Sequence, residues 1–364
     1  RNLRNWSRLR MMQPKLWRRI RVWQDELPFP EVGYGPWRGP LERTVDELHR
    51  QDPFDMVVAT ANPHVAFAAA YHLHKTNGVP YVMDYRDAWL LNVFSGERLH
   101  GPRSRAARWE RRLVESAHEV WFVNDPIREW HAALYPHHAH RMHTVANGFD
   151  PDLAPAIHGR SAAGNRPIRF GYIGTVSPKV PLAEFIDGWR LGREMSPSLA
   201  IADAAIRGYL GFYAMPDPKL FALLDSARDV SVHYDGPAAK GEIGSVYDTF
   251  DALLLILGTG RYVTSGKVFE YLATGLPIVS VHDPGNAASD VLRGHPLWFP
   301  AASLEPSDVA NALTDAAEAA QTVGDDVRAK AREFGARFQR GLQLDPRIDA
   351  LHSTVSETRR SMHG

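Results

Sequence analysis

The sequence predicts two α/β domains, each built on a parallel β-sheet, because short apolar segments alternate with longer helical patterns along most of the chain. A chain of 364 residues is too long for one ordinary hydrophobic core, so two domains are expected. The run from Ala252 to Leu257 is apolar at every position. Such a run is typical of a central strand that is buried on both faces of a parallel sheet.

The elements expected in the first half begin at Phe54. We predict strands over 54–60, 79–84, 119–123 and 143–145, with helices over 63–76 and 103–117 and a further helix opened by Asn124-Asp125-Pro126. Residues 1–50 show little β pattern, and the chain begins with Arg1 instead of Met. We therefore expect the first strands of this domain, with their glycine-rich loop, to be absent from the sequence.

Residues 151–166 are rich in Pro, Ala, Gly and Ser without periodicity, which predicts the domain boundary there. The second half then predicts strands over 168–173, 199–206, 230–234, 252–257 and 277–281, with helices over 181–194, 218–227, 241–249, 266–274, 306–320 and 325–340. The predicted domains are 1–150 and 151–340. The tail, 341–364, is expected to pack back towards the N-terminal domain.

Composition excludes several classes of function. The formal net charge is zero, so no overall basic field calls for nucleic acid. There is no cysteine, which excludes thiol catalysis, thiolate metal sites and disulfides. No apolar run approaches the roughly 20 residues that a membrane-spanning helix needs. A dinucleotide dehydrogenase is also disfavoured, because no Gly-x-Gly-x-x-Gly follows a predicted strand.

The N-terminal segment is basic and contains tryptophan. Eight Arg and Lys residues lie between Arg1 and Arg21, the first acid is Asp25, and Trp6, Trp17 and Trp23 lie among or beside them. This composition allows peripheral contact with anionic lipid headgroups. The alternative is a solvated helix face whose tryptophans dock on the domain.

The most specific motif runs from Ser265 to Val279. Ser265 and Gly266 open a helix after a strand and loop, where free N–H groups and the helix dipole form an anion site. Lys267 adds a cation there, and Glu270 lies one turn further on, where a carboxylate can accept both hydroxyls of a ribose. Gly275 ends the helix. This order fits a nucleoside diphosphate; the alternative is an ordinary capped helix before a strand.

The Ser265–Val279 segment resembles the donor site of glycosyltransferase family 4, especially the bacterial branch that builds cell-surface polysaccharides. Three other pieces match in the same order: Asp84-Tyr85-Arg86-Asp87-Ala88-Trp89, Asn147-Gly148-Phe149-Asp150 and Tyr172-Ile173-Gly174-Thr175. The resemblance covers about residues 50–340.

The resemblance implies a GT-B fold, in which two Rossmann-like domains face each other across a cleft. It implies transfer of a sugar from a nucleotide-diphosphate sugar to an acceptor hydroxyl, with retention, without a bound metal or other cofactor, and with UDP as the favoured carrier. The C-terminal domain would hold the donor and the N-terminal domain a glycan or lipid-linked acceptor. Such an enzyme would work in the cytoplasm, at the inner face of the cell membrane.

In that picture Lys267 and the N–H groups of Ser265 and Gly266 offset charge on the leaving diphosphate, while Glu270 holds the ribose. Gly174 and Thr175 correspond to the place where the family presents a glycine and basic groups to the phosphates. Many members have Arg beside that glycine. Here the expected substitutes are Lys179 and Arg207, each of which has an ordinary structural explanation as the alternative.

A second departure lies eight residues before Glu270. Many members carry another acid there, near the transferred sugar, whereas this chain has Tyr262. We expect sugar contacts from backbone N–H groups or from Arg261 and Tyr262.

On the acceptor side, the chain has Arg86-Asp87 where members often place a His. Asp84 and Asp87 follow a strand end, the usual place of functional groups in such sheets. Either could orient or deprotonate an acceptor hydroxyl. Arg86 could hold a phosphate or pair with Asp87, and the alternative is a structural Asp–Arg turn.

Five histidines, His131, His137, His138, His140 and His143, cluster in the sequence. Their spacing matches no zinc pattern, and a solvated loop is the favoured interpretation.

Two other functions compete with transfer. One is a catalytically silent nucleotide-sugar-binding subunit, which Tyr262 and the short N-terminal domain allow. The other is a GT-B sugar-nucleotide epimerase, which would need more acid–base groups than the motifs supply.

Overall fold

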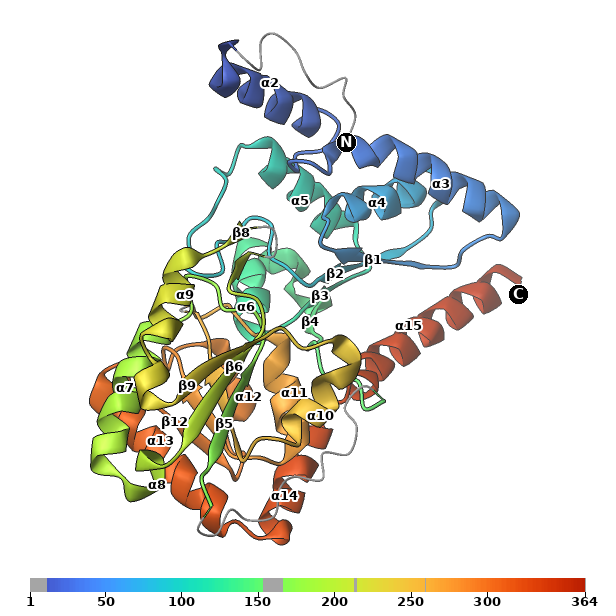
Figure 1. Cartoon of the computed structure of the whole chain (residues 1–364). Coiled ribbons are helices and arrows are strands. Elements are labelled where there is room, and N and C mark those ends of the chain that lie inside the picture. The colour runs from blue at the N-terminus through green and yellow to red at the C-terminus, as the bar shows by residue number, and fades with distance from the viewer. Residues whose placement is uncertain (1–11, 153–165, 213–214, 259, 364) are drawn as a thin grey trace. The chain divides into compact units, whose positions relative to one another are not determined.

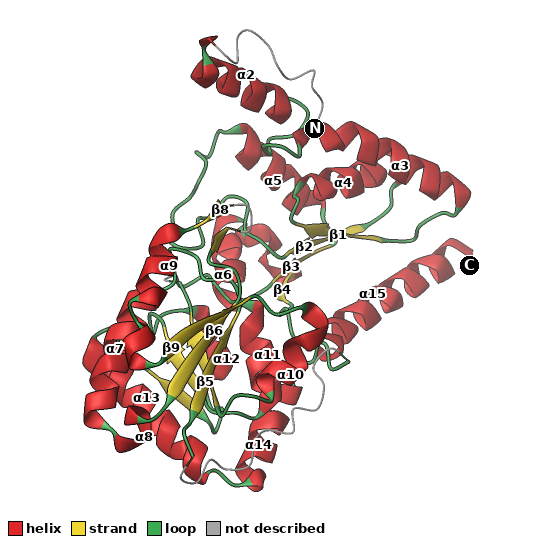
Figure 2. Ribbon diagram, viewed as in Figure 1, coloured by secondary structure: helices red, strands yellow, loops and turns green. Residues whose placement is uncertain are grey.

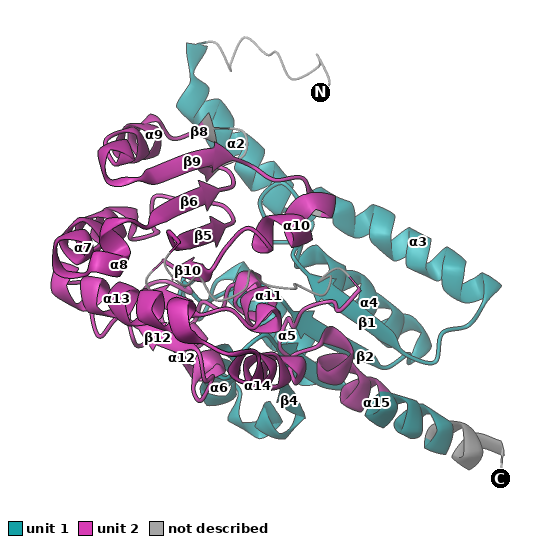
Figure 3. Ribbon diagram, turned by 60° about the horizontal axis from the view of Figure 1, so that its bottom comes forward, with its two compact units in different colours: residues 1–92, 97–145, 349–364 teal, residues 93–96, 146–348 magenta. Residues whose placement is uncertain are grey.

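The computed structural model describes residues 12–152, 166–212, 215–258 and 260–363 (Figure 1). Its contacts divide the chain into two compact units, coloured separately in Figure 3. Unit 1 contains residues 1–92, 97–145 and 349–364, and unit 2 contains residues 93–96 and 146–348. Most of the predicted boundary segment, residues 153–165, lies outside the described residues, as do Arg1 and Trp6 of the basic N-terminal segment.

Unit 1 contains a four-stranded parallel sheet in which the strands lie in sequence order: β1 (Val57–Ala61), β2 (Tyr81–Tyr85), β3 (Glu119–Phe122) and β4 (Met142–Thr144). Every residue of β2 and β3 is buried. The helices that connect the strands are α4 (Val65–Asn77), α5 (Arg105–Ser116) and α6 (Asp125–Leu134). All of the parallel strands therefore direct their carboxyl ends to one edge of this sheet.

Capping fixes the beginnings of two of these helices. The Asn124 side chain accepts a hydrogen bond from the Ile127 amide at the start of α6, and Ser104 does the same for the Ala107 amide at the start of α5. Before β1, the described part of unit 1 contains helices and no strand: α2 (Pro14–Glu26), the short η2 (Gly35–Trp37) and α3 (Arg38–Gln51). A 3₁₀ helix, η3 (Pro136–Arg141), precedes β4.

Unit 2 is built on a six-stranded parallel sheet, with the strand order β12-β11-β10-β5-β6-β9. The strands are β5 (Arg169–Ile173), β6 (Asp203–Arg207), β9 (Val232–Gly236), β10 (Ala252–Ile256), β11 (Ile278–Val281) and β12 (Trp298–Pro300). This is the order of a complete dinucleotide-type Rossmann sheet, and the direction of winding reverses between β5 and β10. Ligands of such sheets bind outside the carboxyl ends of the strands at this switch point.

Helices cover both faces of this sheet (Figure 2). One face packs against α7 (Leu182–Met195) and α13 (Pro306–Thr322), and the other against α10 (Ile243–Tyr247), α11 (Gly266–Thr274) and α12 (Ala287–Leu292). The remaining elements are α8 (Pro197–Ala200), the β7–β8 hairpin (Gly211–Phe212 and Met215–Pro216), α9 (Pro218–Asp225), η4 (Arg228–Val230), η5 (Lys240–Glu242) and α14 (Asp325–Ala336). Strand β10 is buried at all five positions, as its composition predicts.

The last helix, α15 (Arg340–His363), belongs to unit 2 up to Ile348 and to unit 1 from Asp349 onwards. Leu351 in its second part is buried. The sequence predicted a tail here but gave it no secondary structure.

The predicted α/β class with parallel sheets is confirmed in both units, and each predicted strand and helix from residue 54 onwards has a counterpart. One of the differences in bounds has a local chemical cause. The strand predicted from residue 199 begins at Asp203, because Pro197 starts the short helix α8. No described helix is long and apolar enough to cross a lipid bilayer.

Candidate functional site

The loops that follow β5 and β10 lie on either side of the switch point of unit 2. Gly174 comes directly after β5, and Gly258 comes shortly after β10. The side-chain amide of Asn286 donates to the Gly258 carbonyl (3.1 Å), so the turn after β11 supports the loop after β10. The sheet thus brings three loops together at its carboxyl edge.

The backbone at this edge is packed too closely for side chains at two positions. The amide of Gly174 donates to the Arg207 carbonyl (2.9 Å), and Gly208 lies against the other side of Gly174. A Cβ at Gly208 would lie 1.9 Å from the Gly174 carbonyl oxygen, and both glycines have φ near +140°. Only glycine fits this approach, so the backbones that follow β5 and β6 lie in direct contact at this edge.

Helix α11 begins at the same edge. Ser265 has extended dihedral angles and occupies the N-cap, but its hydroxyl forms no capping hydrogen bond in the described structure. The amides of the first turn therefore lack the side-chain partner that Asn124 provides in α6. Gly266 is exposed, and Gly275 ends the helix in the left-handed conformation, as predicted. Among the described residues, no side chain caps the start of α11, and uncapped amides at a helix start are suited to receive an anion.

Lys267 holds its ammonium group beside β5. Its Nζ donates to the Tyr172 hydroxyl (2.7 Å) and lies 4.0 Å from the centre of the Tyr172 ring. A Cβ at Gly174 would approach Nζ to 2.7 Å, so ammonium and glycine are adjacent. Part of the Lys267 side chain is exposed, but burial of its charged end lowers its pKa to about 7, against a smaller opposing effect of Glu270. Among the residues that the structure describes, no ionised group contacts this buried cation, as suits a site that receives an anion.

Tyr172 fixes the position of this ammonium. Its hydroxyl donates to the Thr175 carbonyl (2.9 Å), which leaves a lone pair for the proton of Lys267. Burial raises the pKa of Tyr172 well above its usual range, so the phenol stays neutral beside the lysine.

Glu270 lies on the same helix, exposed to solvent. The buried Tyr247 donates its hydroxyl to Glu270 Oε2 (3.2 Å). This bond holds the carboxylate in place, and a carboxylate has lone pairs for several further donors. Lys267 and Glu270 therefore present a cation and an acceptor about one helical turn apart.

The other candidates in unit 2 lie around this edge. Arg207 ends β6, and its Nε is buried with no hydrogen-bond partner among the described residues. Thr175 is exposed. Lys179 is also exposed, and its Nζ lies 3.3 Å from the centre of the Phe94 ring, within unit 2. The ammonium of Lys179 thus has an aromatic partner.

Arg261 and Tyr262 lie in the loop between β10 and α11, Arg261 exposed and Tyr262 half-buried. Both form contacts within the protein. Residue 259 of this loop lies outside the described structure. The loop reaches the switch point through Gly258, so these side chains belong to the same edge.

In unit 1, the two candidate carboxylates are held differently: Asp84 lies inside β2 and not after the strand as predicted, whereas Asp87 follows it. Asp84 is buried; Arg86 Nε contacts its Oδ2 and Arg86 Nη2 its Oδ1, both at 2.8 Å. Thr60 Oγ1 also donates to Asp84 Oδ2 (3.2 Å), and Arg86 Nη1 donates to the Val145 carbonyl (3.1 Å). This bidentate pair ties the ends of β1, β2 and β4 together.

Asp87, by contrast, is exposed at the same edge, and its backbone carbonyl is fixed by His64 Nε2 (3.1 Å). The other ring nitrogen of His64 lies 3.3 Å from Glu31 Oε1. Glu31 in turn accepts hydrogen bonds from the amides of His64 and Val65, at the start of α4. The Asp87 turn therefore rests on a buried histidine that the sequence did not single out.

The sequence and the fold were compared with those of known proteins. Residues 7–148 match the family described as "Glycosyl transferase 4-like domain". Among solved structures, a glycosyltransferase from Rickettsia africae superposes with a TM-score of 0.65 at 10% identity, over 91% of this chain and 82% of that chain. HepE of Anabaena, solved with UDP, gives 0.62 at 16% identity, over 86% and 82%.

A third structure, sucrose-phosphate synthase from Thermosynechococcus elongatus, gives 0.61 at 12% identity, over 91% of this chain and 82% of that chain. Among curated proteins, none matches the sequence. The fold is GT-B, and the chain resembles glycosyltransferase family 4.

Within this GT-B chain the clustered histidines do not form a metal site. His131 is fully buried, with Nδ1 2.8 Å from the Ile127 carbonyl and Nε2 3.5 Å from Glu110 Oε1. His138 lies in η3 and contacts Arg141. Among the described residues, no group of three or more His, Cys, Asp or Glu side chains could hold a metal ion.

Three supporting residues of this GT-B protein were not assigned roles from the sequence. Tyr172 belongs to the motif Tyr172-Ile173-Gly174-Thr175, and its position two residues before Gly174 was the only feature of the sequence that pointed to it. Tyr247 reaches Glu270 from 23 residues away, and His64 reaches Asp87 from the start of α4. No local pattern predicts these two contacts.

Proposed function

We propose that this chain transfers a sugar from a nucleotide-diphosphate sugar to an acceptor hydroxyl. The observation that carries the proposal is the start of α11 at the switch point of unit 2. There, unfilled first-turn amides, the Lys267 ammonium and the Glu270 carboxylate lie on one helix. A diphosphate needs donors and positive charge, and the ribose beyond it needs an acceptor.

In this proposal the diphosphate binds beside Gly174, next to the Lys267 ammonium. Lys267 and the amides of Ser265 and Gly266 stabilise the charge that develops on the leaving group. Arg207 supports the assignment, because its buried Nε is a donor that the described chain leaves unused. Thr175 and Lys179 complete the rim, although the contact of Lys179 with Phe94 makes it the weaker phosphate ligand.

Tyr247 orients the Glu270 carboxylate, which accepts hydrogen bonds from the ribose hydroxyls. UDP is the favoured carrier, supported by the fold shared with HepE, which was solved with UDP. Arg261 and Tyr262 contact the transferred sugar. Transfer with retention and without a metal follows the resemblance to family 4 and forms part of the proposal.

Unit 1 binds the acceptor, a glycan or a lipid-linked molecule that offers a hydroxyl. The protein works in the cytoplasm at the inner face of the membrane. Asp87 is the preferred group to orient or deprotonate that hydroxyl, because it is the exposed carboxylate after β2. Asp84 and Arg86 then act as the framework that holds the turn, since each satisfies the other's charge.

Binding of a diphosphate should be coupled to proton uptake. The pKa of Lys267 is lowered to about 7 in the free protein, and an adjacent diphosphate raises it again because the charged form gains a partner. Between pH 7 and 9, the binding reaction should therefore take up as much as one proton, and affinity should fall as pH rises through this range. Calorimetry in two buffers with different ionisation enthalpies measures the uptake. A binding enthalpy independent of buffer would contradict the role of Lys267.

The donor site itself is tested by titrating UDP, GDP, TDP and ADP into wild type and Glu270→Ala. We expect one nucleotide to bind and Glu270→Ala to lose about 1.5 to 3 kcal/mol, the usual effect of removing a charged hydrogen-bond acceptor. Tyr247→Phe is the matched control, because it removes the orienting bond but keeps the carboxylate, and should lose less than 1 kcal/mol. Equal binding by wild type and Glu270→Ala would show that Glu270 does not hold the ribose.

A silent nucleotide-sugar-binding subunit is the second candidate. Tyr262 favours it, since the acid that many family 4 members place near the sugar is replaced. Binding of a nucleotide sugar without cleavage would identify such a subunit. Interconversion of two sugar nucleotides would instead identify an epimerase.

A further inference from the structure

Helix α2 presents a row of large apolar side chains to solvent. The row consists of Met12 (78% exposed), Leu16 (47%), Ile20 (37%), Trp23 (60%) and Leu27 (47%). The spacing of Leu16, Ile20 and Trp23 places them on one face of the helix, and Met12 and Leu27 lie just before and just after it. No residue of α2 is buried. The row therefore contributes nothing to the core of unit 1.

The row continues into the segment after the helix. Val32, Tyr34 and Trp37 are also exposed, and the rings of Tyr34 and Trp37 pack edge to face at 5.3 Å. As a result, eight of the eighteen large apolar side chains that are exposed in the described chain lie between Met12 and Trp37. Concentration of this kind marks an interaction surface, whereas single exposed apolar residues are ordinary.

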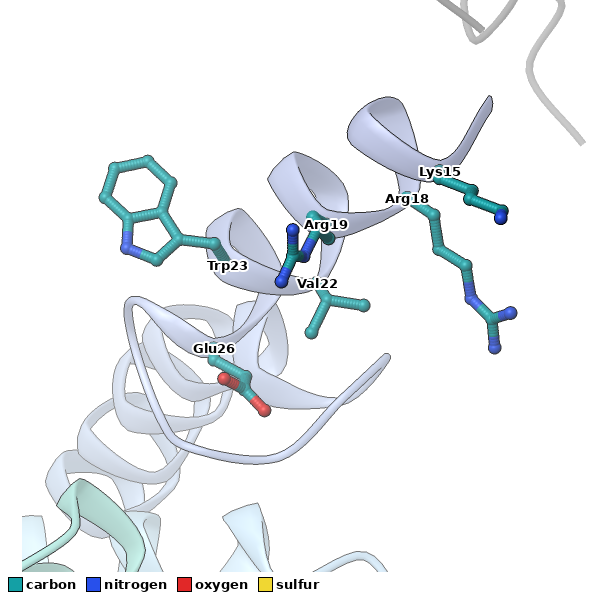
Figure 4. A pocket seen from close by; sticks show the side chains of 6 residues that line it. All are labelled: Lys15, Arg18, Arg19, Val22, Trp23 and Glu26. Atoms are coloured by element: carbon teal, nitrogen blue, oxygen red, sulfur yellow. The ribbon is translucent and has the colours of Figure 1, made fainter. Parts of the chain in front are cut away.

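Basic side chains border the row on one side. A hollow of about 550 Å³ is lined by Lys15, Arg18, Arg19, Val22, Trp23 and Glu26 (Figure 4). The first ten residues of the helix carry four basic side chains and no acid. Such a border places cations where a bilayer carries its phosphate groups, beside side chains that enter the acyl boundary.

The helix is held to unit 1 from its C-terminal end. Arg105 donates to the carbonyls of Glu26 (2.9 Å) and Leu27 (2.6 Å). Gly35 lies so close to the Asp25 carbonyl that a Cβ there would be 1.9 Å from its oxygen. These contacts fix the end of α2 without covering its apolar face.

We propose that this face of α2, with Trp37 and its neighbours, docks unit 1 on an anionic lipid bilayer. The occupant is inferred from charge: an anionic surface matches Lys15, Arg18 and Arg19, and Trp is favoured at membrane interfaces. A parallel pair with a second copy of α2 would instead bring these cations together. The inference does not depend on glycosyl transfer, because the docking face and the candidate donor site belong to different units.

Vesicle co-sedimentation tests the proposal with the full chain, using phosphatidylcholine vesicles with and without phosphatidylglycerol. We expect wild type to bind the anionic vesicles at least ten-fold more tightly. Lys15→Gln/Arg18→Gln/Arg19→Gln should lose roughly 100-fold, at about five-fold for each basic side chain. Leu16→Ser/Ile20→Ser/Trp23→Ser should also lose binding, and its unfolding midpoint should not change because none of these residues is buried.

Two matched control variants test whether any loss of exposed apolar side chains or of positive charge has the same effect on vesicle binding. Met195→Ser/Ile201→Ser removes two apolar side chains in unit 2, each 53% exposed, and should bind vesicles as wild type does. Arg228→Gln/Arg293→Gln/Lys330→Gln makes the same change in net charge elsewhere and should lose much less than the α2 charge variant. Equal binding to neutral and anionic vesicles, or full binding by the apolar α2 variant, would overturn the proposal. Self-association that the apolar variant abolishes, without vesicle binding, would assign the face to a second copy.

Discussion

Lys267→Met should lower the rate of sugar transfer by about 10²- to 10³-fold, the usual cost of removing one group that stabilises transition-state charge. Methionine keeps the unbranched stem but removes the ammonium that Tyr172 holds beside Gly174. Nucleotide affinity should fall as well, because the ground-state diphosphate also contacts the charge. Steady-state kinetics with calorimetry separates the two effects.

The same substitution should stabilise the free protein. The pKa of Lys267 is lowered to about 7 in the folded chain, so the unfolded chain binds more protons between pH 7 and 10.5. Lys267 therefore lowers the free energy of unfolding most below pH 7, and this destabilisation becomes smaller as pH rises. The unfolding midpoint of Lys267→Met should exceed that of wild type, most clearly below pH 7. Loss of function with a gain in stability is the signature of a binding group.

Lys179→Met is the control, since its exposed ammonium already lies against Phe94. It should change the rate only a few-fold. If Lys179→Met were the damaging variant and Lys267→Met behaved as wild type, the phosphate cation would be misassigned.

Glu110→Ala should destabilise unit 1 by about 3 to 5 kcal/mol, the usual cost of removing one partner of a buried charged network. The fully buried Glu110 accepts the hydroxyls of Tyr85 and Tyr135, both at 2.8 Å, and its Oε1 lies 3.5 Å from His131 Nε2. Alanine would leave all three groups without their acceptor. Hydrogen exchange of amides in β2 and β3 under increasing urea measures the loss.

The network also predicts a dependence on pH. Burial tends to raise the pKa of Glu110, but the hydrogen bond and charge of His131 and the two tyrosine hydroxyls outweigh it, so the pKa lies below its usual value. Its contribution to stability is therefore complete above the pKa of an unfolded glutamate and is lost as pH falls through the lower, folded pKa. Glu115→Ala, on the exposed side of the same helix, should change stability by less than about 0.5 kcal/mol. Equal effects of the two substitutions would contradict the network.

The sequence predicted the elements whose cause is local. Helix α11 has the predicted bounds because Ser265 and Gly275 mark its ends, and β10 is apolar throughout because both of its faces are covered. Elements held by distant contacts were not predicted. Strand β12 has three residues and a proline, and it exists because it pairs with β11. The amphipathic α2 lacks the core contacts that usually accompany a helix.

The candidate site divides in the same way. Lys267 and Glu270 are three residues apart on one helix, so the sequence alone predicts that they lie close together. The orienting contacts of Tyr172 and Tyr247 depend on which strands and helices become neighbours. The different environments of Asp84 and Asp87 likewise follow from Thr60 and His64, which reach them from another strand and its loop. A single sequence does not reveal such neighbours.

The most direct test of the central claim is release of nucleotide from a panel of UDP-, GDP-, TDP- and ADP-sugars by the wild-type protein, with lipid extract as a source of acceptor. We predict transfer, or slow hydrolysis without acceptor, from one UDP-sugar, and its loss in Lys267→Met but not in Lys179→Met. Tight binding of a nucleotide sugar with no cleavage of any donor would contradict the claim and identify a silent binding subunit.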